Sequence, residues 1–310
     1  MNVFYTIEVE ATNFCNARCE FCNHSDSARE KGFLDVAKFE TFLDKMEEVI
    51  AENRLFIHGQ KNGFLPKIVF GGLGEALIHP DIKELIFACK KRGFYVSLIT
   101  NGKLLNSDKA KMLIESGIDE IDVSLHTLNE EKEFAITGLH LDYGEICEAV
   151  KLLRGGGINV EFWRILSINE HSRDDIEDAQ RYEEYVQKCG LTSDNVLGPS
   201  LAWSRDGKVA DSRCDTVQDD IIWCHKIIFT FNVDWQGNVV LCCNDYCRES
   251  VDLGNVFDTS FDFDAYFKKI GDIADKKAVP EICRSCRRWR DMEYKEIEKI
   301  YKIQLNDILK

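Results

Sequence analysis

Three cysteines stand close together near the start of the chain. Cys15, Cys19 and Cys22 form the pattern Cys-x3-Cys-x2-Cys directly after a strand-like run, Tyr5–Ala11. Three thiolates on one short loop can bind three irons of a [4Fe–4S] cluster and leave the fourth iron open to a non-protein ligand. A structural zinc ion is the alternative, and it needs a fourth protein ligand, for which His24 is the only local candidate. The spacing favours the iron–sulfur cluster with one open iron.

Three further motifs follow in chain order, each at the end of an expected strand. Gly71–Glu75 (GGLGE) follows the strand Lys67–Phe70, Ser97–Gly102 (SLITNG) ends the next strand, and Ile121–Thr127 (IDVSLHT) ends the one after. Glycines allow close approach of the backbone, and the Glu75 carboxylate can accept hydrogen bonds from an ammonium group. Because active sites of α/β barrels lie at the C-terminal ends of the strands, we expect these motifs to meet.

Taken together, these motifs resemble the signature of the radical S-adenosylmethionine (SAM) enzymes. The resemblance implies that the open iron binds the amino and carboxylate groups of SAM and that the glycine-rich segment receives the amino group. Glu10 matches a glutamate often found before the cysteine loop, Ser124 would reach the ribose, and Arg164 is a candidate for the SAM carboxylate or a substrate hydroxyl. The implied cofactor-binding residues are Phe21, Gly72, Gly74, Glu75, Thr100, Asn101, Ser124 and Arg164.

A second cysteine-rich region follows the last expected strand of the first part. Asp234–Gly237 (DWQG) lies between two strand-like runs, which predicts a β-hairpin. The hairpin can bring Cys224 and Cys242 together, and Cys283 and Cys286 then complete four thiolates, enough for a closed [4Fe–4S] cluster. A zinc ribbon held by the same four cysteines is the alternative.

This region resembles the auxiliary-cluster domain appended to many radical SAM enzymes, called twitch in its one-cluster form and SPASM in its larger form. The features that carry the resemblance are Gly237-x4-Cys242, CCND at Cys242–Asp245, LGN at Leu253–Asn255 and the final Cys-x2-Cys. The larger form adds cysteines after the position of Cys286, and this chain has none there, so we expect one auxiliary [4Fe–4S] cluster. Cys214, Cys243 and Cys247 stay unassigned as packing residues, alternative ligands or a hydrogen-atom donor.

Short apolar runs alternate with segments of helical period, which is the pattern of repeated βα units and a mostly parallel sheet. Strands are expected near 5–11, 67–70, 94–99, 119–125, 158–166 and 195–201. Six such units match the partial (β/α)6 TIM-like barrel that the resemblance implies. We therefore predict an α/β fold with this barrel over 1–206 and a small β-hairpin plus helix domain, holding the auxiliary cluster, over 207–310.

One helix illustrates the local signals. Over about 81–92, Pro80 suits the first turn and Gly93 ends the helix. One apolar stripe is expected from Ile82, Leu85, Ile86 and Cys89. Cys89 is therefore expected to pack in the core, and His79 to belong to the entry of the helix.

Composition excludes several classes of protein. The 310 residues carry a net charge of −15, which disfavours extended contact with nucleic-acid phosphates. No apolar run approaches the ~20 residues of a membrane span, and the N-terminus lacks a signal peptide, so we expect no membrane partner and a cytoplasmic location. The thirteen cysteines fit metal clusters in a reducing compartment better than disulfides.

The resemblance implies a mechanism. A reduced cluster donates an electron to SAM, which splits into methionine and a 5′-deoxyadenosyl radical, and that radical removes a hydrogen atom from the substrate. An auxiliary cluster with four protein ligands cannot bind substrate, but it can accept an electron, as in similar dehydrogenases. The leading hypothesis is dehydrogenation of a small polar substrate such as a sugar, aminocyclitol or nucleoside, with flavodoxin or ferredoxin as electron donor.

Other hypotheses stay open. A maturase that oxidises, crosslinks or epimerises a ribosomally made peptide is less favoured, because the barrel begins almost at Met1 and leaves no room for a peptide-recognition domain. Epimerisation would need a thiol hydrogen donor. A noncatalytic iron–sulfur or zinc protein explains the cysteines but not the glycine-rich segment. The candidate catalytic residues are Glu10, Arg164, Cys214 and Cys247; His126 is a weaker candidate, because a lone histidine is commonly structural.

Overall fold

The computed structural model describes residues 6–51, 67–166, 176–201, 226–227, 230–243, 245–246, 251–274, 278, 280 and 283. Its strands are β1 (Thr6–Glu10), β2 (Lys67–Gly71), β3 (Tyr95–Thr100), β4 (Glu120–Ser124), β5 (Asn159–Leu166), β6 (Val196–Leu201), β7 (Thr230–Val233) and β8 (Val239–Val240). Its α-helices are α1 (Val36–Ala51), α2 (Ile82–Lys90), α3 (Ser107–Ser116), α4 (Glu130–Thr137), α5 (Tyr143–Gly155), α6 (Ile176–Lys188) and α8 (Phe263–Ala274). Short 3-10 turns are η1 (Asn23–Asp26), η2 (Ala76–Ile78) and η4 (Ser193–Asn195). All six predicted barrel strands are present.

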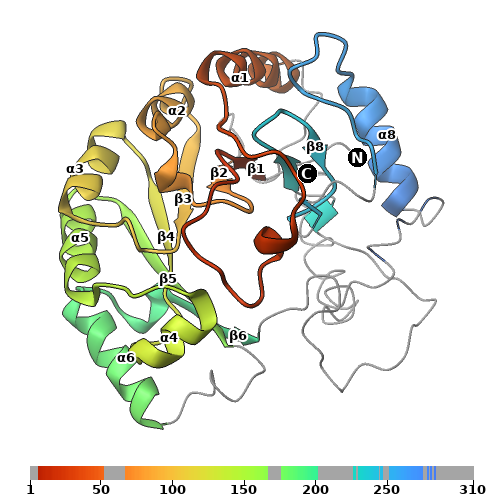
Figure 1. The fold of residues 1–310 in the computed structure, drawn as a ribbon. Helices are drawn as coiled ribbons and strands as arrows, with labels where there is room; N and C mark the ends of the chain where they lie inside the picture. Colours follow the sequence, from red (N-terminus) through yellow and green to blue (C-terminus); the bar gives the residue numbers. More distant parts are fainter. Residues whose placement is uncertain are drawn as a thin grey trace, which may run out of the picture.

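The strands form one curved sheet in the order β6-β5-β4-β3-β2-β1-β7-β8. Strands β1 to β6 follow one another in chain order, and every neighbouring pair among them is parallel. Figure 1 shows α1, α2, α3, α5 and α6 along the outer side of the sheet, whereas the loop after β1 crosses its inner side. This arrangement confirms the predicted α/β fold and its partial barrel.

The two faces of the sheet differ in polarity. Side chains that alternate along the strands, such as Ile7, Phe70 and Leu98, pack with the helices into one apolar core. The residues between them, on the inner face, are mostly polar and include Glu8, Glu10, Ser97, Glu120, Asp122, Ser124 and Glu161, together with the apolar Val69, Ile99 and Trp163. The inside of the partial barrel is therefore mostly polar and suited to a polar ligand.

The apolar stripe predicted for α2 is confirmed, although the helix is shorter than 81–92 and Pro80 precedes its N-cap, Asp81. Its four stripe residues are buried, and Cys89 is fully covered in the core. His79 receives a hydrogen bond from the Asp81 amide at Nδ1, over 3.0 Å, and its Nε2 lies 2.9 Å from the Leu34 carbonyl oxygen, so it holds the entry of the helix. None of the nine cysteines that the structure describes forms a disulfide.

The predicted hairpin is present and continues the barrel sheet. Strand β7 pairs with β1 in parallel, with Thr6 opposite Thr230 and Val9 opposite Val233, and β8 pairs with β7 in the antiparallel direction. The hairpin therefore lies on the free edge of β1. The predicted domain boundary after residue 206 lies outside the described residues. Within the described part of the chain, no helix is long and apolar enough to cross a membrane.

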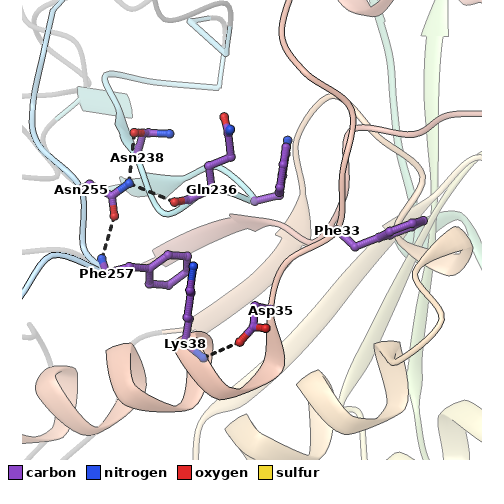
Figure 2. A pocket seen from close by; sticks show the side chains of 8 residues that line it. Phe33, Asp35, Lys38, Gln236, Asn238, Asn255 and Phe257 are labelled. Atoms are coloured by element: carbon purple, nitrogen blue, oxygen red, sulfur yellow. Dashed lines mark hydrogen bonds between the residues drawn. The ribbon is translucent and has the colours of Figure 1, made fainter.

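Asn255 of the LGN sequence stabilises the hairpin turn through side-chain hydrogen bonds. The Asn255 side-chain amide donates to the Gln236 carbonyl, over 2.9 Å, and to Asn238 Oδ1, over 3.1 Å, while its own Oδ1 accepts from the Phe257 amide. Figure 2 shows these bonds around a cavity of about 390 Å³ between the turn and the start of α1, where Lys38 lies. This cavity lies at the junction of hairpin and barrel.

Gly237 gives a test of that junction. Its φ is +86°, and an added Cβ would come within 2.3 Å of the Phe257 ring. We expect Gly237→Ala to cost about 2 kcal/mol and to lower the melting temperature by roughly 4–8 °C. The measurement is circular dichroism of the anaerobic, reconstituted protein.

Gly271→Ala is the matched control, because an added Cβ there meets no atom within 4 Å. Alanine also has the higher helix propensity, so the control should melt at the wild-type temperature or above. Equal melting temperatures for the two variants would contradict the close packing of Gly237 against Phe257.

Candidate active site

The loop with the first three cysteines is held from both sides. On one side, the Arg18 amide donates to the Thr137 carbonyl at the end of α4, over 2.7 Å. On the other, the Glu75 amide donates to the Phe14 carbonyl, over 2.8 Å. The three cysteines of this loop are half-buried. The loop is thus fixed between the ends of β2 and α4.

The three sulfurs do not form a compact zinc site. Zinc–sulfur bonds of about 2.3 Å hold the sulfurs of a tetrahedral site about 3.8 Å apart. Among the described residues, the only three acidic, cysteine or histidine side chains with ligand atoms all within 4.8 Å are carboxylates, so the three sulfurs spread more widely. His24 is also engaged elsewhere, since its Nε2 lies 2.9 Å from the Asn13 carbonyl oxygen and 2.7 Å from Lys31 Nζ.

The Cys15 and Cys19 thiols need a nearby cation to ionise. Burial is the main cause that raises the pKa of Cys15 to about 11, and it raises the pKa of Cys19 further, with the neighbouring cysteines adding to both shifts. Bound iron would supply the positive charge that stabilises the thiolates. The donor set is therefore consistent with a resident cluster.

The glycine-rich segment touches the cysteine loop backbone to backbone. A Cβ on Gly74 would lie 1.9 Å from the Thr12 carbonyl oxygen and 2.9 Å from that of Phe14. Gly72 has φ +98°, and a Cβ there would come 2.9 Å from Glu10 Cβ. Only glycine fits either position, so the segment and the loop form one unit.

Glu75 is the buried centre of this unit. Its Oε1 accepts from Thr100 Oγ1, over 2.9 Å, and from the Leu77 amide, over 3.1 Å; its Oε2 accepts from the Asn101 amide, over 2.7 Å. Burial raises the pKa of Glu75, and these three donors oppose that rise. The carboxylate therefore joins the ends of β2 and β3.

Asn101 extends the connection to the cysteines. Its side-chain amide donates to Asn16 Oδ1 over 2.7 Å and lies 3.9 Å from Cys15 Sγ. The structure thus brings together Gly74, Glu75, Thr100 and Asn101, as predicted. Their binding of SAM stays a prediction.

Phe21, His126 and Arg164 form a second group, at the ends of β4 and β5. The Phe21 ring meets the His126 ring edge to face, with centroids 5.4 Å apart. The Arg164 Nε donates to the His126 carbonyl over 3.2 Å, and its guanidinium lies 3.9 Å from the centre of the Tyr182 ring. Arg164 is thereby directed to α6, and its predicted contact with SAM or substrate is not tested by this geometry.

His126 is buried and neutral. Burial, followed by the nearby Arg164 charge, lowers its pKa to about 4. Its Nδ1 accepts from the Ile165 amide over 3.2 Å, so the neutral ring carries its proton on Nε2. These contacts match the structural role that the sequence favoured.

Glu133 of α4 lies under the same group. Its Oε2 accepts from the His126 and Thr127 amides, while its buried Oε1 has no hydrogen-bond partner. Burial raises the pKa of Glu133 to about 7. Nothing in the sequence pattern distinguished this glutamate from the exposed acids beside it on α4.

Glu10 is held in a buried ion-pair network. The Arg29 guanidinium donates to both Glu10 oxygens, over 2.6 and 3.0 Å, and lies 3.1 Å from Asp234 Oδ2 in the hairpin turn. The Leu73 amide also donates to Glu10 Oε2 over 3.3 Å. The catalytic role of Glu10 stays a prediction. The observed role of its carboxylate is to join β1 to the hairpin.

Neighbouring cysteines of the hairpin point to different sides. Cys242 packs against the main core, which also contains Cys283. Cys243 packs with Cys22 against a small separate group, which consists of Leu73, Val240 and Tyr246. Cys242 and Cys283 thus both contact the main core, and their binding of one auxiliary cluster stays a prediction. The predicted residues Cys214, Cys224, Cys247 and Cys286 lie outside the described residues.

Tyr246 comes between the two cysteine regions. It is buried, and its hydroxyl donates to Glu8 Oε1 on the inner face of β1 over 2.9 Å. No sequence motif predicted this contact. The auxiliary segment thus reaches the inside of the barrel.

Comparison with known families agrees with this site. The profile of the radical SAM superfamily matches residues 9–182, which include the cysteine loop and the motifs on β2 to β4. The chain belongs to the radical SAM superfamily. The profile described as an iron–sulfur cluster-binding domain, SPASM, matches residues 224–287. The family resemblance predicted from the motifs is confirmed, together with the cofactors it implies: SAM, a SAM-binding [4Fe–4S] cluster and an auxiliary iron–sulfur cluster.

Two curated relatives show how diverse this superfamily is. The tungsten-containing aldehyde ferredoxin oxidoreductase cofactor-modifying protein of Pyrococcus furiosus is 33% identical over 145 residues, 47% of this chain and 37% of that protein. The PqqA peptide cyclase of Gluconobacter oxydans is 29% identical over 150 residues, 48% of this chain and 38% of that protein. The chain matches less than two fifths of the length of either relative.

Two solved structures share the fold. BtrN, in complex with AdoMet and 2-DOIA, aligns with a TM-score of 0.60 and 18% identity over 93% of this chain and 94% of its own. SuiB from Streptococcus suis, bound to the precursor peptide SuiA, aligns with a TM-score of 0.56 and 15% identity over 92% of this chain and 71% of its own. At these identities the likeness concerns the fold alone.

Gly74 offers a direct test of the unit that holds the cysteine loop. We expect Gly74→Ala to displace the loop, because its Cβ would overlap the Thr12 carbonyl. Anaerobic reconstitution followed by iron analysis should show about four irons fewer per chain than wild type, with the auxiliary irons retained. Gly155→Ala, where an added Cβ meets nothing within 4 Å, should keep the wild-type iron content. Full iron content in both variants would contradict the close contact.

Proposed function

We propose that this protein is a radical SAM oxidoreductase that dehydrogenates a small polar substrate and passes an electron to an auxiliary [4Fe–4S] cluster. The observation that carries the proposal is the joining of the two cysteine regions at β1. Cys22 and Cys243 pack against one small group, and the Arg29 ion pairs connect the barrel with the hairpin. An auxiliary cluster beside the barrel would be placed to accept an electron from a substrate radical.

The chain's own residues would position SAM at the strand ends. Cys15, Cys19 and Cys22 would hold the first cluster, which supplies the electron that cleaves SAM to methionine and a 5′-deoxyadenosyl radical. Glu75 fixes the turn after β3 through Thr100 and the Asn101 amide. Ser124 ends β4 on the inner face, where the ribose would lie.

The proposal also requires an electron donor for the first cluster and a reducing environment for the cysteines. The first cluster would be reduced by a flavodoxin or a ferredoxin. A reducing compartment, which we propose is the cytoplasm, would keep the described cysteines, none of which forms a disulfide, in the reduced state.

A second candidate function is peptide maturation. Named relatives and fold neighbours include a PqqA peptide cyclase and a SuiB structure bound to a precursor peptide. Those peptide substrates belong to those proteins. The two functions are separated by presenting the reconstituted protein with small polyols and with peptides, and by observing which class yields a product together with deoxyadenosine.

The first test concerns radical initiation. A triple Cys15→Ala, Cys19→Ala, Cys22→Ala variant should lose about four of about eight irons and all deoxyadenosine formation under strong reduction. The wild-type protein should form deoxyadenosine. Zinc in place of iron in the wild-type protein, or no deoxyadenosine from it, would reject the radical mechanism.

The second test concerns the auxiliary cluster. A double Cys242→Ala, Cys283→Ala variant should lose about four irons yet still cleave SAM, because the first cluster keeps its ligands. The double variant Cys89→Ala, Cys147→Ala removes two cysteines that pack in the core, and it should keep all irons. If zinc, and no iron, is lost with Cys242 and Cys283, a zinc ribbon replaces the auxiliary cluster.

A further inference from the structure

Three acidic side chains lie together on the inner face of the barrel. They are closer to the N-terminal ends of the strands than Ser124, the residue expected at the SAM ribose. Asp122 precedes Ser124 by two positions on β4 and is opposite Glu161 on β5. The ligand oxygens of Glu120, Asp122 and Glu161 all lie within 4.8 Å of one another. We call these three residues the acidic triad.

Asp122 is the buried member of the acidic triad. Its exposed fraction is 3%, and its Oδ1 has no hydrogen-bond partner. Burial raises the pKa of Asp122 to about 7, and the charges of Glu120 and Glu161 add to that rise. A buried acceptor without a partner is costly, so this site is suited to a donor that the protein itself does not supply.

The described residues do not balance the negative charge of the acidic triad. Among them, Lys67 is the cation that acts on Asp122, and its ammonium pairs with Glu120 Oε1. The Tyr95 hydroxyl donates to Glu120 Oε2 over 2.9 Å. Both oxygens of Glu120 are therefore engaged, and the carboxylates left to receive a further positive charge are Asp122 and Glu161.

An aromatic surface adjoins these two carboxylates. Trp163 stands opposite Ser124 in the register of β4 and β5, and its side chain is 36% exposed. The Trp163 side chain also lies close enough to the Asp122 carboxyl to oppose the rise in its pKa. On β3, the hydroxyl of Ser97 is buried without a partner. A carboxylate beside an indole face is a favourable place for an alkylammonium group.

We propose that Asp122, with Glu161 and Trp163, binds a primary ammonium group of the substrate, so that the substrate is an amine. The inference rests on the proposed function, because it takes the inner face of the barrel as the substrate site. Two residues of strand span about 6.6 Å, so an ammonium at Asp122 directs the attached carbon skeleton toward the ribose position at Ser124. The ammonium belongs to a small amine or to a peptide lysine.

The test uses two molecules that differ in one group. The probes are trans-4-aminocyclohexanol and its neutral counterpart trans-1,4-cyclohexanediol, added to the anaerobic holoprotein with SAM. Binding is measured by saturation-transfer NMR titration. We expect the amine to bind about ten-fold or more tightly than the diol, as a charge-assisted hydrogen bond to a buried carboxylate predicts. Asp122→Asn should abolish that preference.

The control variant is Glu148→Gln. It removes one negative charge at the surface, where Glu148 pairs with Lys151, and should keep the ten-fold preference. The preference should also grow between pH 6 and 8, because Asp122 becomes ionised through its pKa of about 7 while an alkylammonium, with a pKa of about 10, stays charged. Asp122→Asn should lack this pH dependence.

Further measurements distinguish a peptide lysine from a small amine and define the results that would overturn the inference. Tighter binding of Nα-acetyl-lysine N-methylamide than of the aminocyclohexanol would assign the ammonium to a peptide, and the reverse order to a small amine. Equal binding of amine and diol, no saturable binding of either amine, or a preference unchanged in Asp122→Asn would overturn the inference. Binding of Mn²⁺ that disappears in Asp122→Asn would also overturn it, in favour of a metal site. Amine preference in a wild-type protein that forms no deoxyadenosine would retain the site and reject the proposed function.

Discussion

The buried ion pairs of Arg29 couple the segment after the cysteine loop to the first strand and to the hairpin. Arg29 follows the cysteine loop, Glu10 ends the first strand, and Asp234 opens the hairpin turn, so one guanidinium joins three segments. The desolvation cost of burying such charges is large, and the bidentate geometry with Glu10 offsets it only while all partners are present. Burial raises the pKa of Glu10, and the Arg29 charge opposes that rise. The position of the cysteine loop relative to the hairpin is therefore coupled to one electrostatic network, whose partial loss would leave an uncompensated buried charge.

A second connection works at the level of the backbone. Glycine at position 74 lets the segment after β2 touch the carbonyls of the cysteine loop, and Glu75 then accepts hydrogen bonds from the end of β3. Three consecutive strand ends are thus fixed by contacts that contain no bound group. Each of these contacts restricts the loop that carries the cysteines, and a restricted loop loses less entropy when it binds a cluster. The raised pKa of the buried Cys15 thiol is the cost of that arrangement, and a metal cation removes it.

Much of this organisation could be predicted from the sequence, because its signals are local. Strand positions, the stripe of α2 and the hairpin turn are encoded within a few residues, and the meeting of the glycine-rich segment with the cysteine loop follows from the geometry of parallel strands. Contacts between distant segments could not be predicted. Arg29 and Asp234 are separated by about two hundred positions, and neither belongs to a pattern that specifies the other. The same holds for Arg164, whose guanidinium lies over the Tyr182 ring, and for Asp122, whose buried Oδ1 has no hydrogen-bond partner. Both environments depend on which strands are neighbours and on what covers each face of the sheet.

The pairing of β7 with β1 also affects how the chain can fold during synthesis. Thr6 finds its partner on that side only when Thr230 has been made, so one edge of β1 is unpaired while most of the chain is still emerging. An unpaired strand edge next to apolar residues such as Ile7 and Val9 is a template for association with other chains. On the ribosome, the half-made barrel would therefore expose this edge until the hairpin arrives. Truncated forms that end before the hairpin should for the same reason aggregate rather than fold as a smaller barrel.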